Sequence, residues 1–434
     1  YDMFAWDVSR FGHWADKAFT KAKALDAYSH RFKIHFPLEE RDAGRPMRQR
    51  PIYELQKSMG ARFGLNYGWE HPLWFCPEGQ DIQDTYGYER QPWWNVVGEE
   101  CKTLREKVGL IDISNFAKYE VKGPGACDWL DQIVANKVPR EAGKTCLAPL
   151  LSVFGGIAGD FTITCLGEDH LMMVGSGMAE RYHQRYFNKV PRPAGVSFES
   201  KTEAMVGFNL AGPLARDVLA GLTDVDLSND NWRFMRSKQI KVAGIDVLAL
   251  RVSFTGDLGW ELHTAVEHQE ALYRALLTAG APHGIKPVGG RALLSLRIEK
   301  GYGSWGREYS PEYWPQESGL DGLIKMDKPE FLGKAAYAKL KDNPPRYKLV
   351  QLAITDSDAD ALGSEPIFTK SGEPCGLVSS GFYSFTTGQP LALAYIRAEY
   401  ADHNEFDVAV LGVNKPAKLL REAAFDPSGS KLRA

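Results

Sequence analysis

The run Asp342-Asn343-Pro344-Pro345 divides the chain into two parts with different hydrophobic patterns. Before it, from about residue 95 to 330, short strand-like runs alternate with helix-like runs, as is typical of a mixed fold. After it, short apolar runs such as 349–354 and 391–395 are separated by Gly, Pro and Asp turns. We therefore expect an α+β body followed by a small all-β barrel or sandwich of about 80 residues.

Residues 1–80 are rich in aromatic residues and Arg but contain few predicted elements. Helical spacing of Trp14, Ala18, Ala22 and Leu25 predicts a helix, and the alternation over 33–36 predicts a short strand. One helix and one strand are too little for a core, so we expect this segment to pack on another part of the chain.

Composition excludes several classes of protein. The 52 Lys and Arg against 55 Asp and Glu give a net charge of −3, which argues against a nucleic-acid binder. No stretch approaches the roughly 20 apolar residues of a membrane-spanning helix. The six Cys form no Cys-x-x-Cys pair and no zinc spacing is present, so we expect no metal site. Scattered thiols of this kind favour a reducing compartment, either a bacterial cytoplasm or a mitochondrial matrix.

Asp160 is the first candidate functional residue. It follows the Gly-rich run Gly155-Gly156-Ile157-Ala158-Gly159 and precedes an apolar strand. This places a carboxylate at the mouth of a strand, with small neighbours that let a ligand approach. The alternative is an Asp that caps a turn.

Glu261 is the second candidate, in a segment that contains Gly256, Gly259 and Trp260. Alternation along a strand directs Trp260 and Glu261 to opposite faces. Phe254 and Trp260 are suited to flank a flat heterocycle, and Glu261 to accept two hydrogen bonds from its edge. The alternative is a hairpin with one packed Trp and one solvated Glu.

Arg291 is the third candidate, because it opens a predicted helix, where the helix dipole disfavours a cation. Such an Arg needs an acidic partner or an anionic ligand, and a surface ion pair would suffice. No pair among the three candidates has metal-ligand or catalytic-triad spacing, and no Gly-x-Gly-x-x-Gly dinucleotide motif is present.

Several motifs run in order through residues 95–434. They are Gly109-Leu110-Ile111-Asp112-Ile113-Ser114, Tyr119-Glu120-Val121-Lys122-Gly123-Pro124, Gly155-Gly156 through Asp160, Thr255-Gly256-Asp257-Leu258-Gly259-Trp260-Glu261, Gly290-Arg291, Gly319-Leu320, Phe331-Leu332-Gly333-Lys334, Gly376-Leu377-Val378-Ser379-Ser380 and Phe425-Asp426-Pro427. Together they resemble the aminomethyltransferase (glycine-cleavage T-protein) family of tetrahydrofolate enzymes.

A second set of motifs lies in residues 1–80. It comprises Asp7-Val8-Ser9-Arg10-Phe11, Glu40-Arg41-Asp42-Ala43-Gly44-Arg45-Pro46, Phe63-Gly64 and Gly68-Trp69-Glu70-His71-Pro72-Leu73-Trp74-Phe75. This set resembles the end of the flavin half of dimethylglycine and sarcosine dehydrogenases. The chain starts at Tyr1 without an initiator Met, so the resemblance implies the carboxyl-terminal half of a longer enzyme or a separate subunit.

The two resemblances imply a domain division and a function. Residues 1–80 would be the tail of the flavin oxidoreductase half, 81–341 the folate-binding body and 346–434 the barrel. The implied reaction captures the carbon from oxidative N-demethylation of a dimethylglycine- or sarcosine-like amine as 5,10-methylenetetrahydrofolate. The implied cofactors are tetrahydrofolate, in this chain, and FAD, only in a missing amino-terminal half or partner subunit.

The resemblance also implies roles for the candidate residues. Asp160 would be catalytic, Glu261 would bind the amino-pyrimidine edge of the pterin, and Arg291 would face the glutamate tail or position neighbouring acids. Phe254 and Trp260 would complete the cofactor site.

Three positions depart from the family pattern: Leu147 and Gly322, where aromatic residues are often found, and Phe254, where the family has a Tyr. Each change would remove stacking or a hydroxyl group from the expected folate pocket. Leu147 and Gly322 leave open a non-catalytic partner of a flavin demethylase subunit. A folate-dependent demethylase of an S- or O-methyl substrate is the other alternative, and the flavin-like motifs of residues 1–80 argue against it.

Overall fold

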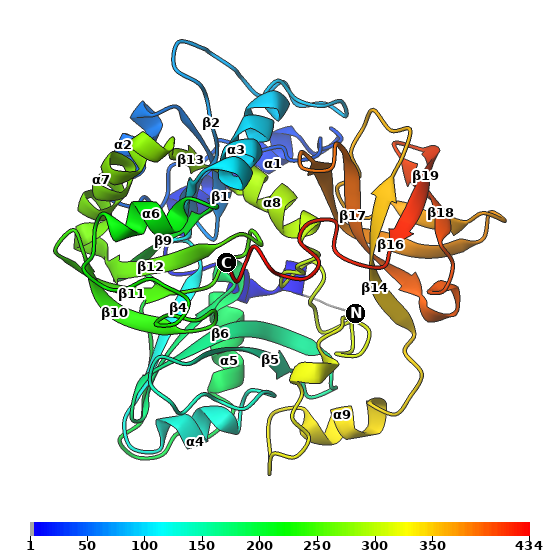
Figure 1. The fold of residues 1–434 in the computed structure, drawn as a ribbon. Helices are drawn as coiled ribbons and strands as arrows, with labels where there is room; N and C mark the ends of the chain where they lie inside the picture. Colours follow the sequence, from blue (N-terminus) through cyan, green and yellow to red (C-terminus); the bar gives the residue numbers. More distant parts are fainter. Residues whose placement is uncertain (1–3) are drawn as a thin grey trace.

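A six-stranded sheet, a five-stranded sheet and a closed barrel organise residues 4–434, the part of the chain that this computed structural model describes (Figure 1). The α+β class and the terminal barrel are confirmed. Tyr1, where the sequence suggested a cut from a longer enzyme, lies outside the described residues. No helix among those described combines the length and the apolar character that crossing a bilayer requires.

The first sheet has six strands in the order β10-β11-β12-β9-β3-β13, antiparallel except for the pair β3 and β13. Its strands are β3 (Gly109–Asp112), β9 (Met205–Ala211), β10 (Ser237–Val242), β11 (Ile245–Leu250), β12 (Gly259–Ala265) and β13 (Lys286–Val288). Helices α6 (Ala215–Ala220) and α7 (Gln269–Gly280) pack on one face of this sheet and bury their Leu and Val side chains there.

The second sheet has five antiparallel strands in the order β5-β6-β7-β4-β8. Its strands are β4 (Ala117–Lys122), β5 (Thr145–Leu151), β6 (Ile157–Gly167), β7 (His170–Gly175) and β8 (Ser197–Ser200). Helices α4 (Ala126–Asp131) and α5 (Glu180–Phe187) complete its core, where Trp129, Phe161 and Phe187 are buried.

The barrel closes through six strands in the order β14-β17-β16-β15-β18-β19. They are β14 (Tyr347–Ile354), β15 (Pro366–Thr369), β16 (Pro374–Ser384), β17 (Gln389–Arg397), β18 (Glu405–Val410) and β19 (Val413–Leu420). The predicted linker 342–345 joins α9 (Lys334–Leu340) to β14. Helices α3 (Trp94–Glu106) and α8 (Gly290–Glu299) lie between the first sheet and the barrel and share a hydrophobic core with both.

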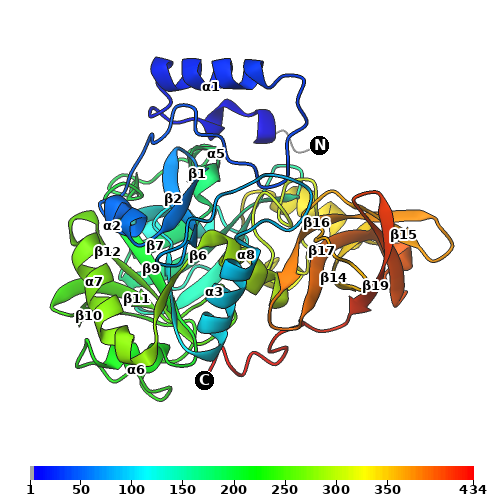
Figure 2. The same cartoon turned by 90° about the horizontal axis from the view of Figure 1, so that it is seen from above.

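The N-terminal segment follows the prediction only in part. The predicted helix is α1 (Lys17–Ser29), which Asp16 caps by accepting a hydrogen bond from the Phe19 N–H. Figure 2 shows α1 at the edge of the molecule, away from the barrel. The strand predicted over 33–36 is wrong, because these residues are exposed and irregular and find no partner strand.

The expectation that this segment packs on another part of the chain is confirmed. After α2 (Tyr53–Ser58), strands β1 (Ala61–Asn66) and β2 (Trp69–Phe75) form a hairpin. The fully buried Trp74 of β2 packs into the core that α3 and α8 share.

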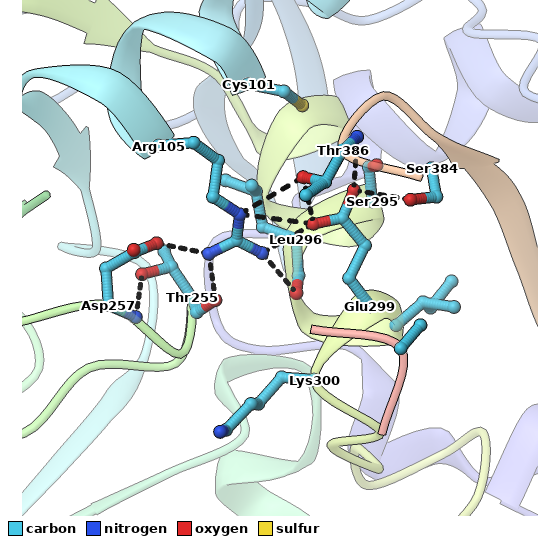
Figure 3. Close-up of polar contacts among 12 residues, drawn as sticks. Cys101, Arg105, Thr255, Asp257, Ser295, Leu296, Glu299, Lys300, Ser384 and Thr386 are labelled. Carbon is cyan, nitrogen blue, oxygen red and sulfur yellow. Dashed lines mark hydrogen bonds and ion pairs between the residues drawn. The ribbon is translucent and has the colours of Figure 1, made fainter. Parts of the chain in front are cut away.

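A buried ion cluster joins four parts of the fold (Figure 3). Arg105, at the end of α3, forms ion pairs with Asp257 in the loop before β12 and with Glu299 at the end of α8. Its Nη2 lies 2.6 Å from Oε2 of Glu299. Ser384 and Thr386 in the barrel donate hydrogen bonds to the Glu299 carboxylate at 2.9 and 2.7 Å. We call Arg105, Asp257 and Glu299 the Arg105 cluster.

Substituting Arg105→Met leaves the buried carboxylates of Asp257 and Glu299 without their cation. Removing one partner of a buried ion pair costs about 3–5 kcal/mol, so the urea midpoint of unfolding should fall clearly below that of the parent. Arg274→Met, which removes an exposed pair with Glu270 four residues away on α7, should cost less than about 0.5 kcal/mol. Equal midpoints for the two variants would contradict a structural role for the Arg105 cluster.

Candidate functional site

A cavity of about 500 Å³ lies between the two sheets, α8 and the N-terminal segment. Its wall brings together residues from many segments: Leu38, Glu40, Asn66, His71, Pro72, Leu73, Ile111, Asp112, Ile113, Asn115, Phe116, Leu147, Asp160, Thr162, Val174, Gly175, Ser176, Asn209, Phe254, Glu261, Gly290, Arg291, Leu293, Leu294, Arg297, Gly303, Ser304, Trp305 and Arg307. Four of the five predicted site residues lie in this wall. A volume of this size is typical of a site for one organic ligand.

Asp160 reaches the cavity from β6. Its neighbour Phe161 points to the opposite face and is buried in the core of the second sheet, whereas Thr162 lies on the same face as Asp160 and also lines the cavity. Burial raises the pKa of Asp160 to about 7. No other residue among 4–434 donates a hydrogen bond to its carboxyl group, which leaves the group free for a ligand.

The Gly pair before Asp160 has a different role from the one predicted. A Cβ at Gly156 would lie 2.0 Å from the Pro311 carbonyl oxygen, and one at Gly155 would meet the backbone of Tyr337 at 3.1 Å. Neither glycine lines the cavity. The pair is therefore required for packing against the segment 311–337 rather than for the approach of a ligand.

Glu261 enters the cavity from β12, opposite Asn209 on the neighbouring strand β9. The Glu261 side chain is 18% exposed, and its Oε2 lies 3.4 Å from Nε2 of the buried His263. Asn209 donates from Nδ2 to the Trp260 carbonyl, but its buried Oδ1 has no hydrogen-bond partner among the described residues. The two strands thus present a carboxylate and an unpartnered amide oxygen side by side, a site for a ligand edge rich in N–H donors.

Trp260 does not line the cavity, so the prediction that it flanks a ligand together with Phe254 is wrong. It alternates with Glu261 on β12 and is fully buried on the other face of the sheet, where it packs against Trp232. Phe254 does lie in the cavity wall, and its ring stacks on Tyr302 at a centroid distance of 5.9 Å.

Arg291 lies in the first turn of α8 with its charge already paired. Its Nη1 lies 3.3 Å from a carboxylate oxygen of Asp84, and its Cζ lies 3.8 Å from the centre of the Trp93 ring. Its Nη2 donates to the Leu38 carbonyl at 3.4 Å. The sequence predicted either an acidic partner or an anionic ligand for Arg291, and in the structure Arg291 has an acidic partner.

The two positions where the family often has an aromatic residue, Leu147 and Gly322, differ in location. Leu147 lies in the cavity wall, as predicted. Gly322 does not, and a Cβ built there would have no atom within 4 Å. The prediction that Gly322 removes stacking from the pocket is wrong, because its position in the 3-10 helix Asp321–Leu323 is outside the cavity wall.

Sequence reasoning missed the contribution of the N-terminal segment. Glu40 and His71 line the cavity, and no local pattern around either residue indicates a site. Burial raises the pKa of Glu40 and, with Arg45 nearby, lowers the pKa of His71 to about 4, so that His71 is neutral at physiological pH. Asn209 was also missed, although a polar residue within the apolar run Phe208-Asn209-Leu210 is a usable signal.

No group of three or more His, Cys, Asp and Glu side chains that could hold a metal ion occurs within residues 4–434. All six cysteines are free, and five of them are buried.

The two aromatic residues of the predicted site should respond differently to truncation. Trp260→Ala opens a cavity in the core and should lower the free energy of unfolding by about 3–5 kcal/mol. Phe254→Ala removes a ring that is only half-buried, so its loss in the same urea titration should be clearly smaller. A larger loss for Phe254→Ala would contradict the placement of the two rings.

The raised pKa of Asp160 predicts a pH-dependent penalty to stability. The folded-state pKa of about 7 lies above the unfolded value of about 3.9, so the free energy of unfolding falls as the pH rises through this window. Asp160→Asn removes the penalty and should be more stable than the parent at pH 8, with the difference vanishing below about pH 4. Asp230→Asn, at an exposed position, is the matched control. A pH-independent difference for Asp160→Asn would contradict the burial of its charge.

Comparison with known proteins agrees with this architecture. The model of the GCVT N-terminal domain matches residues 52–328, the glycine cleavage T-protein C-terminal barrel domain matches 348–426, and the FAD dependent oxidoreductase central domain matches 1–49. The predicted boundary between residues 80 and 81 stays a prediction.

Relatives align along most or all of the chain. Mitochondrial dimethylglycine dehydrogenase of Rattus norvegicus is 35% identical over all of this chain, which spans about half (51%) of that protein. Aminomethyltransferase of Halothermothrix orenii is 30% identical over 83% of this chain and 94% of its own length. The aminomethyltransferase T structure from Bartonella henselae has the same fold, with a TM-score of 0.75 at 24% identity, over 88% of this chain and 98% of its own. The chain therefore belongs to the aminomethyltransferase (glycine cleavage T-protein) family.

Proposed function

We propose that the cavity binds tetrahydrofolate and that Asp160 assists the transfer of a one-carbon unit to it. The observation that carries this proposal is that one cavity wall contains both the free carboxyl group of Asp160 and the hydrogen-bond acceptors of Glu261 and Asn209. Membership of the aminomethyltransferase family supports folate-dependent one-carbon transfer as the general activity.

The residues of the cavity wall are suited to bind tetrahydrofolate. The amino-pyrimidine edge of a pterin presents several N–H donors, and Glu261 with the unpartnered Asn209 Oδ1 offers acceptors on neighbouring strands. A hydrogen bond to the Glu261 carboxylate is charge-assisted and thus stronger than a neutral one. Apolar side chains such as Ile111, Leu147 and Phe254 supply surfaces for the ring faces.

Tetrahydrofolate supplies the two nitrogens that accept the carbon. Asp160 has a pKa of about 7, so both its protonated and its ionised forms are populated near neutral pH. Its carboxyl oxygen accepts the proton that a nitrogen loses as the new bond to carbon forms, and its protonated form returns a proton in the reverse direction. Apolar side chains of the wall such as Leu147 and Val174 limit the contact of this exchange with water.

The carbon would come from an N-methyl amine such as dimethylglycine or sarcosine. A flavin-binding half or partner subunit would supply the oxidation, taking two electrons and a proton from the amine to leave an iminium ion. The methylene carbon would then pass to tetrahydrofolate and the amine would leave with one methyl group fewer, which would give 5,10-methylenetetrahydrofolate. The similarity to dimethylglycine dehydrogenase over the whole chain supports this source, as does the oxidoreductase match of residues 1–49.

A reducing compartment, either a bacterial cytoplasm or a mitochondrial matrix, suits the six free thiols.

A second candidate is a non-catalytic partner of a flavin subunit. Leu147 favours it, because an aliphatic side chain stands in the cavity wall where the family often has an aromatic one. Under that hypothesis, Asp160 and Glu261 variants bind tetrahydrofolate no differently from the parent, and the parent itself binds weakly or not at all.

Titration with tetrahydrofolate, followed by isothermal calorimetry, tests the two roles separately. Glu261→Gln removes a charged acceptor and should weaken binding about 10- to 100-fold. Asp160→Asn should bind nearly as well as the parent but form 5,10-methylenetetrahydrofolate about 10²–10⁴-fold more slowly when a flavin-binding half oxidises the amine. The exposed Asp230→Asn should change neither quantity. Parent-like binding by Glu261→Gln would refute the pterin site, and a parent-like rate for Asp160→Asn would refute its catalytic role.

A further inference from the structure

The cavity wall contains three arginines among its described residues, and two of them are neutralised by acids. Arg291 pairs with Asp84. Arg297 is buried and pairs with the fully buried Glu308 at 3.0 Å, while its Nη2 donates to the Ser380 hydroxyl at 2.7 Å. Neither guanidinium has a charge left for a ligand.

Arg307 is different. It is exposed at the cavity wall, and its side chain makes no ion pair, hydrogen bond or ring contact with any residue described in the structure. Its backbone is held in place, because its N–H donates to the Ser304 carbonyl. Trp305, two residues earlier, is buried and packs edge-on against His183. The segment that carries Arg307 is therefore held by a backbone hydrogen bond and by the packing of a side chain.

The charge of Arg307 acts on Arg297 and not on Asp160. Burial lowers the pKa of Arg297, Glu308 opposes this shift, and repulsion from the Arg307 guanidinium adds to it. No cation contributes to the pKa of Asp160, which burial alone raises. The wall therefore carries uncompensated positive charge at Arg307 and a neutral-to-anionic region around Asp160 and Glu261.

We propose that Arg307 is a carboxylate-binding residue of this cavity and determines its preference for ligands that carry a carboxylate. A guanidinium forms paired, charge-assisted hydrogen bonds with a carboxylate, and an unpartnered one beside a ligand cavity is suited to that contact. The proposal rests on the proposed function for the identity of the ligands. The carboxylate has two possible sources there: the glutamyl tail of tetrahydrofolate, or the amino acid that donates the carbon.

The experiment compares three probes on the parent and on Arg307→Gln. The probes are tetrahydrofolate, tetrahydropterin without a glutamyl tail, and N,N-dimethylglycine, each titrated by calorimetry at low and high salt. Arg307→Lys keeps the charge and should retain part of the affinity. Arg233→Gln removes an equally exposed arginine that lies outside the cavity and is the matched control.

If Arg307 binds the glutamyl tail, Arg307→Gln weakens tetrahydrofolate binding about tenfold or more, reduces its salt dependence and leaves tetrahydropterin binding unchanged. If Arg307 binds the carbon donor, the loss appears with N,N-dimethylglycine and not with tetrahydrofolate. Parent-like affinity of Arg307→Gln for all three probes overturns the proposal.

The two proposals fail in different ways. A parent that binds neither tetrahydrofolate nor tetrahydropterin refutes the proposed function, and the N,N-dimethylglycine titration then still decides for or against Arg307. A parent that binds tetrahydrofolate while Arg307→Gln and Arg233→Gln behave alike refutes only the role of Arg307. Equal weakening of tetrahydrofolate and tetrahydropterin by Arg307→Gln also overturns it, because a tail contact cannot affect a ligand without a tail.

Discussion

The Arg105 cluster is the interaction on which the relative placement of body and barrel depends. One guanidinium faces two buried carboxylates, so the cluster retains an excess negative charge that Arg105 alone does not cancel. Burial accordingly raises the pKa of Asp257 to about 6, although Arg105 opposes the shift. The barrel does not cancel this charge but stabilises the Glu299 carboxylate, since the hydroxyl groups of Ser384 and Thr386 donate hydrogen bonds to it. Docking of the barrel therefore completes a charge network that begins in the body, which gives the contact a specificity that apolar packing alone does not provide.

The same cluster shapes the cavity. Asp257 lies in the loop between Phe254 and Glu261, and Arg105 also binds the Thr255 carbonyl at 2.8 Å. The loop is thus fixed at two points, one on each side of Gly256, whose φ of 86° suits a residue without a side chain. With the loop held, Phe254 enters the cavity wall and β12 begins in the register that opposes Glu261 to Asn209. A contact made outside the cavity therefore helps to hold the loop that brings Phe254 into the cavity wall.

Much of this could be predicted from the sequence, and the errors have physical causes. The two-residue alternation of side chains along a strand correctly predicted that Trp260 and Glu261 lie on opposite faces. It does not say which face of the strand meets a cavity, and the Trp260 ring was therefore wrongly assigned to the ligand. Asp160, Glu261 and Arg291 were found because each stands beside a glycine or at a helix start, where local chemistry is unusual. Glu40 and His71 have no such local signal. His71 reaches the cavity through the packing of β2 on α8, and Glu40 lies beside β1, where its carboxylate accepts a hydrogen bond from the Leu65 N–H at 3.2 Å. The exposed run 33–36 alternates like a strand, and only the missing partner strand excludes it.

The electrostatics of the wall explain why a buried carboxyl group and three arginines can share one cavity. A free cation beside Asp160 would stabilise its ionised form and lower its pKa, which would remove the protonated form at neutral pH. The structure avoids this by pairing Arg291 with Asp84 and Arg297 with Glu308, both acids outside the cavity wall, and by keeping His71 neutral. Among the described residues of the wall, Arg307 is the one arginine without an acidic partner, and its charge does not contribute to the pKa of Asp160. The wall thus separates a region suited to proton transfer from a region suited to an anion, and a ligand with a donor-rich ring at one end and a carboxylate at the other matches both.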